Sequence, residues 1–262
     1  MTLQAWPYPF WIAHRGAGQL APENTLAAFQ LGASLGYRMF ECDVKLSADE
    51  VPFLMHDATL NRTTDALTKL GDLASKTGGD HAWEALAKLD AGAWHSRPYQ
   101  GEPLATLEQV AGFCLKNQLA INLEIKPTPG TGYRTGVVVA TAVERLWGQE
   151  GSVASPQPLL SSFEVEALRG ARDAAAHLPR ALLLDELWSG WQATAQALEV
   201  AALVCRHTRW TEPLVEQARS AGWHCLSYTV NTLDEVHRLR QLGTHGVITD
   251  RVDIFKPDLS LP

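Results

Sequence analysis

The stretch that decides the fold is residues 202–249, which read ALVCRHTRWTEPLVEQARSAGWHCLSYTVNTLDEVHRLRQLGTHGVIT. Its apolar runs predict strands at Ala202–Arg206, His224–Val230 and Gly246–Thr249. The amphipathic segments between them predict helices at Glu212–Ala221 and Leu233–Leu242. Strands that alternate with helices in this way lie parallel and are joined by right-handed crossovers.

The same alternation runs through the rest of the chain. Further strands are predicted at Phe10–Ala13, Met39–Leu46, Val51–His56, Ala120–Lys126, Leu159–Phe163 and Arg180–Leu184. Further helices are predicted at Thr25–Leu35, Thr106–Lys116, Thr135–Trp147 and Glu164–Ala176. With Val51–His56 as a hairpin extension of the second strand, eight strand–helix units remain in about 250 residues, which predicts a (β/α)₈ TIM barrel. A doubly wound open sheet is the alternative, and the lack of a glycine-rich dinucleotide loop after the first strand weakens it.

The alternation of strands and helices is interrupted at Asn61–Pro103, a polar stretch that holds several glycines. We interpret this stretch as a small insertion between the second and third β/α units. The sequence shows no internal repeat and no low-complexity linker, so residues 1–262 are predicted to form a single domain.

The composition limits the class of protein and its partners. Hydrophobic residues make up 46% and charged residues 19%, which is typical of a globular chain and not of a disordered one. The formal charge of −7 disfavours nucleic acid and anionic lipid as partners. No apolar run is long enough to span a bilayer, so no membrane insertion is expected. A small-molecule substrate is expected, and a homo-oligomer is left open.

The N-terminus and the cysteines indicate a compartment. Met1–Phe10 has no basic region, long apolar core or small-residue cleavage site, so it does not resemble a signal peptide. The four cysteines, Cys42, Cys114, Cys205 and Cys225, form no C-x-x-C pair and are predicted to be buried free thiols. Together these features predict a cytoplasmic protein.

Three carboxylates lie in or at the ends of predicted strands. Glu41 and Asp43 share one face of the second strand, and Glu124 shares a face with Asn122 and Lys126. Burial against helices without partners would cost several kcal/mol, so the acids are predicted to face the lumen or its mouth. A shared divalent cation would offset their repulsion, and all-oxygen ligands favour Mg²⁺ or Ca²⁺. The alternative is that Glu41 and Asp43 are paired separately with lysines or caps.

Two histidines lie at strand ends beside other ionisable groups. His14 precedes Arg15, and His56 follows the hairpin strand. Two imidazoles can serve as general base and general acid, while Arg15 and Lys126 can bind a phosphate. Each histidine could instead be a satisfied core residue, and each cation a partner in an ion pair. Taken together, the set indicates metal-assisted cleavage of a phosphodiester.

Other histidines and two tryptophans carry weaker signals. The remaining histidines are expected to be structural: His81, His95, His177, His207, His224, His237 and His245. Trp188 and Trp191 follow the fifth parallel strand, where they either line a substrate pocket or pack within a loop.

An ordered set of motifs resembles the glycerophosphodiester phosphodiesterase family and covers residues 14–250, nearly the whole chain. In order, the motifs are His14-Arg15-Gly16, Pro22-Glu23-Asn24-Thr25, Glu41-Cys42-Asp43-Val44, His56-Asp57 with Leu60 and Arg62-Thr63-Thr64, Glu124-Ile125-Lys126-Pro127, Ser162-Phe163, Thr229-Val230-Asn231, and Gly246-Val247-Ile248-Thr249-Asp250. Each motif is weak alone, and the ordered set is specific.

The resemblance implies a (β/α)₈ barrel with a small insertion and assigns roles to the motif residues. It implies His14 and His56 as the acid–base pair, Glu41, Asp43 and Glu124 as ligands of one divalent cation, and Arg15 and Lys126 as phosphate-binding residues. Tyr228 is expected to bind substrate near the rim of the barrel. Family members usually have Trp at this position, so we expect a difference in pocket shape.

The function implied is hydrolysis of a glycerophosphodiester to sn-glycerol 3-phosphate and an alcohol. The nearest alternative is a barrel phospholipase D of the sphingomyelinase type, which is disfavoured by the missing signal peptide and by His14-Arg15-Gly16. A non-catalytic phosphate-binding barrel is the other alternative. It is disfavoured because a protein that only binds phosphate has no use for two proton carriers.

Overall fold

Eight parallel strands close into a barrel in the computed structural model, which describes residues 5–148 and 156–257. The ring closes because β1 pairs with β2 on one side and with β9 on the other. This closure confirms the predicted (β/α)₈ barrel and excludes the open sheet. In ring order the parallel strands are β1 (Trp11–Ala13), β2 (Met39–Leu46), β4 (Ala120–Ile125), β5 (Leu159–Ser162), β6 (Arg180–Leu184), β7 (Ala202–Arg206), β8 (His224–Tyr228) and β9 (Gly246–Thr249).

The predicted hairpin extension of the second strand is also present. Strand β3 (Pro52–Leu54) runs antiparallel to β2, with Val44 opposite Leu54. It adds a ninth strand at the outside of the ring and leaves the parallel barrel unbroken. The chain leaves β3 opposite Val44 of β2, and the Met55 amide then donates to the Asp43 carbonyl, so His56 follows close to the part of β2 that carries the acids.

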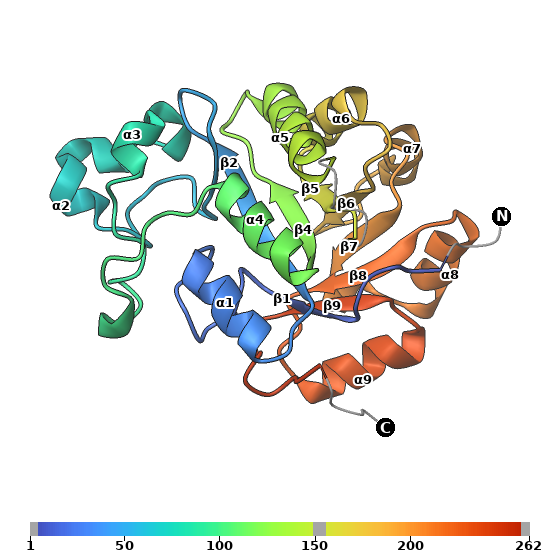
Figure 1. Cartoon of the computed structure of the whole chain (residues 1–262). Coiled ribbons are helices and arrows are strands. Elements are labelled where there is room, and N and C mark those ends of the chain that lie inside the picture. The colour runs from blue at the N-terminus through green and yellow to red at the C-terminus, as the bar shows by residue number, and fades with distance from the viewer. Residues whose placement is uncertain (1–4, 149–155, 258–262) are drawn as a thin grey trace.

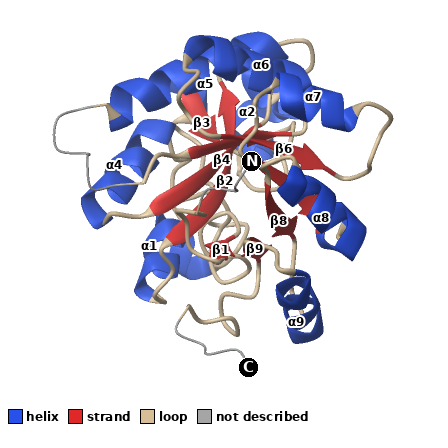
Figure 2. Ribbon diagram, turned by 90° about the vertical axis from the view of Figure 1, so that its right-hand side faces the viewer, coloured by secondary structure: helices blue, strands red, loops and turns tan. Residues whose placement is uncertain are grey.

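Seven helices of the described residues surround the barrel, as Figure 2 shows. They are α1 (Leu26–Ser34), α4 (Leu107–Asn117), α5 (Gly132–Trp147), α6 (Val165–Ala174), α7 (Trp191–Ala197), α8 (Glu212–Ser220) and α9 (Leu233–Leu242). Thr25 caps α1 by accepting a hydrogen bond from the Ala28 amide, and Thr106 and Gln109 form a capping box on α4. Helix α7 was not predicted, because its sequence WQATAQA has only seven residues and no apolar period.

Apolar side chains form two cores, one on each face of the barrel sheet. Between strands and helices lies the larger apolar core, which the outward-facing residues of each strand share with the helices. Inside the barrel, a smaller apolar cluster that includes Ile12, Met39, Leu159 and Leu226 closes the lumen toward the N-terminal ends of the strands. The charged lumen residues Glu41, Asp43 and Glu124 therefore lie toward the C-terminal end, where barrel enzymes place their active sites.

The insertion forms a small lobe beside the barrel, at the left of Figure 1. It contains α2 (Ala66–Leu70), α3 (Trp83–Leu86) and short 3₁₀ turns at Gly71–Ser75, Gly78–Asp80 and Arg97–Tyr99. A cluster of its own, which includes Leu60, Leu86 and Leu104, packs on Phe53 of β3. One part of the prediction is wrong: the insertion precedes α4, the helix that returns the chain from β2 to β4. It therefore lies within the second β/α unit and not between the second and third.

Two further expectations concern thiols and membranes. The four cysteines are free and buried, as predicted. Among the residues that the structure describes, we find no helix with both the length and the apolar character needed to cross a bilayer.

Candidate active site

A pocket of about 440 Å³ opens at the C-terminal end of the barrel, and seven predicted site residues line it together. They come from four different strand ends and from the β3 hairpin: His14, Arg15, Glu41, His56, Glu124, Lys126 and Tyr228. The eighth, Asp43, is buried beside them and shares the acidic cluster. The fold thus gathers residues that lie as much as two hundred positions apart in the sequence.

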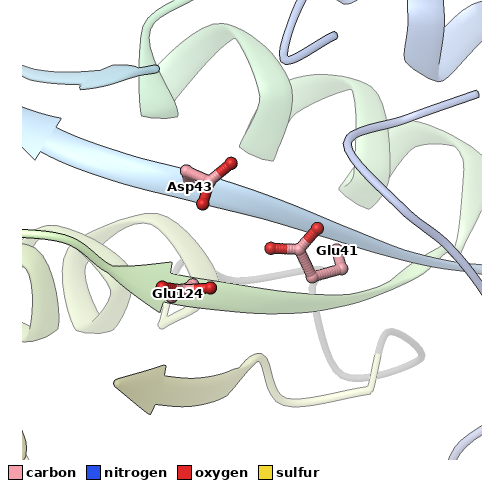
Figure 3. Close-up of side chains that lie close together, drawn as sticks. All are labelled: Glu41, Asp43 and Glu124. Carbon is pink, nitrogen blue, oxygen red and sulfur yellow. The ribbon is translucent and has the colours of Figure 1, made fainter. Parts of the chain in front are cut away.

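The three acids form one cluster because β2 and β4 are neighbours in register. Asp43 lies opposite Glu124, and Glu41 lies two residues earlier on the same face of β2. Each carboxyl group offers an oxygen within 4.8 Å of the others, and Figure 3 shows the three groups on these two strands. The alternative of acids paired separately with lysines or caps does not describe this shared arrangement.

Burial and mutual repulsion perturb the three acids. Burial, and then the charges of Asp43 and Glu124, raise the pKa of Glu41 well above its usual range. Burial and Asp43 likewise raise the pKa of Glu124 to about 7, against the opposing charge of Lys126. Burial also opposes ionisation of Asp43, but Arg15 and Lys126 outweigh it and lower the pKa of this group.

The cluster fits a hard divalent cation. Its donors are all carboxylate oxygens, the ligands that Mg²⁺ and Ca²⁺ prefer. Oε1 of Glu41 is buried and has no hydrogen-bond partner within the described residues, so it is available as a ligand. A bound cation would also offset the repulsion that raises the two glutamate pKa values.

Arg15 and Lys126 flank the cluster. Arg15 has a left-handed backbone, with a φ of 51°, and its amide donates to Oε2 of Glu41 at 3.1 Å. Its guanidinium lies between Glu23, at 2.9 Å, and Asp43, at 3.4 Å. Nζ of Lys126 lies 3.3 Å from Glu124. Two cations beside a candidate metal site are placed to meet an anionic phosphate.

His14 is held by a carboxylate from the last strand end. Its Nδ1 lies 2.5 Å from Oδ1 of Asp250, while its Nε2 lies 3.7 Å from Glu41. The amide of Asn231 donates to the other oxygen of Asp250 at 2.9 Å. This chain of contacts fixes the imidazole ring and leaves Nε2 directed at the cluster side of the pocket.

His56 is held in the same manner. Its Nδ1 lies 2.8 Å from Oδ1 of Asp57, and Arg62 donates to both oxygens of that carboxylate. Burial, together with the charges of Arg15 and Lys126, lowers the pKa of His56 despite the opposing charge of Asp43. The ring is therefore neutral at neutral pH and is able to accept a proton.

Arg62 connects the two sides of the site. Besides Asp57, its guanidinium donates to Oε1 and Oε2 of Glu23, at 2.7 and 2.8 Å. Because Glu23 also binds Arg15, one arginine from the insertion braces both a histidine and a candidate phosphate-binding residue.

The opposite side of the pocket is largely apolar. Phe163, Leu183 and Ile248 line it, and the rings of Phe163 and Tyr228 meet edge to face with centroids 5.7 Å apart. The Tyr228 hydroxyl donates to Asp185 at 3.2 Å, and Arg206 binds the same carboxylate oxygen at 2.5 Å.

Neither tryptophan of the loop after β6 lines this pocket. Trp191 is buried beside Trp223, with ring centroids 6.0 Å apart, so it packs as part of the helical layer. Trp188 is 41% exposed. Trp191 therefore packs and does not line the pocket, but it does so from the first turn of α7 and not within a loop.

A closed (β/α)₈ barrel with paired histidines, clustered acids and cations at its C-terminal mouth defines an enzyme. The class becomes specific in comparison with known families: the model of the glycerophosphoryl diester phosphodiesterase family matches residues 14–254. The chain belongs to this family and is an enzyme of the glycerophosphodiester phosphodiesterase class. The resemblance inferred from the motifs is thereby confirmed.

Individual relatives agree over nearly their whole length. The chain is 30% identical to a glycerophosphodiester phosphodiesterase of Caldanaerobacter subterraneus, over 91% of this chain and 93% of the relative. It resembles the structure of an Oleispira antarctica phosphodiesterase in complex with the product sn-glycerol-3-phosphate, with a TM-score of 0.81, 30% identity and 93% of each chain covered. A glycerophosphodiester phosphodiesterase structure from Agrobacterium tumefaciens gives a TM-score of 0.77 at 25% identity, covering 95% of this chain and 99% of that one.

Several residues that hold the site received no role from the sequence. They are Glu23, Asn24, Asp57, Arg62, Asn231 and Asp250, which orient the histidines, Arg15 and Asp43. For Asp250 a signal existed: β1 and β9 are neighbours in a closed barrel, so the residues after Ala13 and Thr249 had to lie side by side.

Proposed function

We propose that the chain hydrolyses glycerophosphodiesters to sn-glycerol 3-phosphate and an alcohol, with one divalent cation and two catalytic histidines. The observation that carries the proposal is the pairing of each histidine with a carboxylate, in the same pocket as the acidic cluster. A structural neighbour was solved with sn-glycerol-3-phosphate as its product, which supports the same product here.

Glu41, Asp43 and Glu124 are the residues that would hold the cation, as Mg²⁺ or Ca²⁺. When bound, the cation supplies Lewis-acid polarisation of the phosphodiester and neutralises part of its charge. Arg15 and Lys126 bind the phosphate oxygens and stabilise the charge that grows on them in the transition state. Tyr228 contacts the substrate from the apolar side of the pocket.

The histidines move the protons. One imidazole accepts the proton of the attacking hydroxyl, and the other donates a proton to the oxygen of the leaving alcohol. Asp250 and Asp57 keep each ring in a fixed orientation and stabilise the imidazolium that forms during the reaction. The attacking group is either water or the 2-hydroxyl of the glycerol, in which case a cyclic phosphate forms and water then opens it.

Two other features of the proposal rest on sequence and burial. We propose that residues 1–262 form a single domain, because no linker interrupts the strand–helix alternation. We also propose a cytoplasmic enzyme, because its four cysteines are free and buried.

The test measures release of sn-glycerol 3-phosphate from glycerophosphocholine and glycerophosphoethanolamine, with Mg²⁺ or Ca²⁺ and with a chelator. The proposal expects release that the chelator abolishes and the added cation restores. Sphingomyelin in parallel assays tests the phospholipase D alternative. Binding of sn-glycerol 3-phosphate without turnover of any diester would favour the non-catalytic alternative.

A further inference from the structure

Asn122 is a buried polar residue of the pocket to which the mechanism above gives no task. Its side chain lies on the lumen face of β4, is 1% exposed and lines the pocket. The register places it directly opposite Glu41 and two residues before Glu124. It thus lies one level deeper than Glu124, at the floor of the catalytic pocket.

The amide of Asn122 has no hydrogen-bond partner in the described part of the chain. Both Nδ2 and Oδ1 are buried and unpaired. Two other residues that line the pocket, Leu183 and Ile248, are 4% and 2% exposed and offer no polar side-chain atoms. Glu41, opposite Asn122, leaves its own Oε1 unpaired among the described residues. A buried amide without partners destabilises the folded chain, so a polar group of a ligand is the expected partner.

We infer that Asn122 binds a hydroxyl group of the glycerol moiety and makes the pocket selective for glycerol-bearing phosphodiesters. The inference rests on the proposed function and deepens it, since it names the part of the substrate that the floor recognises. A hydroxyl both donates and accepts, so it satisfies Oδ1 and Nδ2 together. A cation would use Oδ1 alone and would leave the NH₂ group unpaired.

The shape of the pocket places the glycerol at the floor. The phosphate-binding cations and the histidines are nearer the opening, where Arg15 and Lys126 are partly exposed. The floor is closed by buried side chains and suits the part of the substrate that stays the same from one diester to the next. The alcohol varies among substrates and therefore occupies the open side.

The test compares two ligands by titration calorimetry in the presence of Mg²⁺: sn-glycerol 3-phosphate and n-propyl phosphate, which lacks both hydroxyls. Asn122→Leu removes the amide at similar volume. We expect this variant to bind sn-glycerol 3-phosphate about tenfold to a hundredfold more weakly, the usual effect of losing a hydrogen bond to a hydroxyl group. Binding of n-propyl phosphate should change by less than about threefold.

Two further measurements distinguish this role from a structural one. We expect the melting temperature of Asn122→Leu to stay equal or to rise, because an unpaired buried amide is removed. Ser161→Ala is the matched control: Ser161 also has a buried, unpaired oxygen inside the barrel but does not line the pocket, so it should leave both affinities unchanged. Asn122→Ala repeats the test if the leucine variant does not fold.

The inference would be overturned if Asn122→Leu weakened the binding of both ligands equally. It would also be overturned if this variant lost affinity for Mg²⁺ but still preferred sn-glycerol 3-phosphate over n-propyl phosphate to the same degree. Turnover of glycerophosphocholine by the unsubstituted chain is measured in the same samples. Absent turnover would refute the proposed function, whereas the binding comparison still decides the role of Asn122.

Discussion

The two ends of the barrel each hold a pair of histidines, and the pairs differ in what surrounds them. At the C-terminal mouth, Nδ1 of His14 and of His56 each meets a carboxylate, at 2.5 and 2.8 Å. At the opposite end, His224 and His245 pack ring against ring, with centroids 4.6 Å apart. Trp6 covers His224 at a centroid distance of 4.6 Å. No carboxylate contacts this second pair within the described residues.

In the proposed mechanism, the neighbours of a histidine decide whether it can carry a proton. Burial, and then His245, lowers the pKa of His224 to about 4, so this ring is a neutral packing group at neutral pH. Burial also lowers the pKa of His56, but Asp57 opposes the shift and fixes the ring at a pocket that a substrate can enter. Four predictions, from the largest effect to the smallest, test this contrast.

The largest effect is expected from the histidines themselves. His56→Ala should lower kcat for glycerophosphocholine by about 10²–10⁴-fold, the range of a general acid–base group, and His14→Ala should act similarly. Initial rates of sn-glycerol 3-phosphate release measure this. His224→Phe is the matched control and should keep kcat within about threefold. A loss below tenfold in folded His56→Ala would remove His56 from proton transfer.

The next largest effect on kcat is expected from the carboxylate that holds His14. Asp250→Asn keeps the shape of the side chain but removes the charge that holds His14, so kcat should fall by about 10–100-fold, as for residues that orient a functional histidine. KM should change little, because Asp250 does not line the pocket. A rise in KM with kcat unchanged would show that Asp250 acts on substrate binding and not on His14.

A smaller effect is expected from Arg62, the residue of the insertion that binds both Glu23 and Asp57. Arg62→Gln breaks its contacts to Glu23 and Asp57, and we expect kcat/KM to fall about tenfold, or ~1.4 kcal/mol. Arg134→Gln is the control, because its fork to Glu50 is equally well formed but lies away from the pocket. Both arginines are exposed, so stability should change by less than about 1 kcal/mol in each variant. An equal kcat/KM in the two variants would contradict a role of Arg62 in holding the site.

The smallest effect on activity is expected at His224, which lies outside the pocket and changes the stability of the chain with pH. Because the folded chain lowers the pKa of His224 from 6.5 to about 4, the unfolded chain binds this proton more tightly. The free energy of unfolding should therefore be nearly unaffected by this residue above pH 6.5 and should fall by about 2–3 kcal/mol between pH 6.5 and 4. Urea unfolding of the unsubstituted chain and of His224→Phe at pH 7.5 and 4.5 measures the difference. Parallel losses in both proteins would contradict it.

Much of this architecture could be predicted from the sequence. Strand bounds such as Met39–Leu46 and Arg180–Leu184 agree with the structure residue for residue, because buried parallel strands are rich in apolar residues even where single charged residues interrupt them. Glu41, Asp43 and Glu124 could be placed in one cluster because ionisable groups in such runs must face the lumen.

Other features depend on contacts that a local pattern does not encode. Asp250 meets His14 only because the ring closes between β1 and β9. The brace by Arg62 depends on how the insertion folds back on the mouth, and the vacant hydrogen-bonding groups of Asn122 depend on which neighbours share its floor. Sequence placed Asn122 on the right face but could not show that it lacked a partner.

The measurement that tests the central claim most directly is a calorimetric titration of Mg²⁺ or Ca²⁺, with turnover of glycerophosphocholine followed in the same samples. We predict one ion per chain, turnover that rises in proportion to the bound ion, and loss of both in Glu124→Ala. Turnover that persists in chelator with no ion bound, or an undiminished rate in Glu124→Ala, would contradict the account of a cation that Glu41, Asp43 and Glu124 would hold for the reaction.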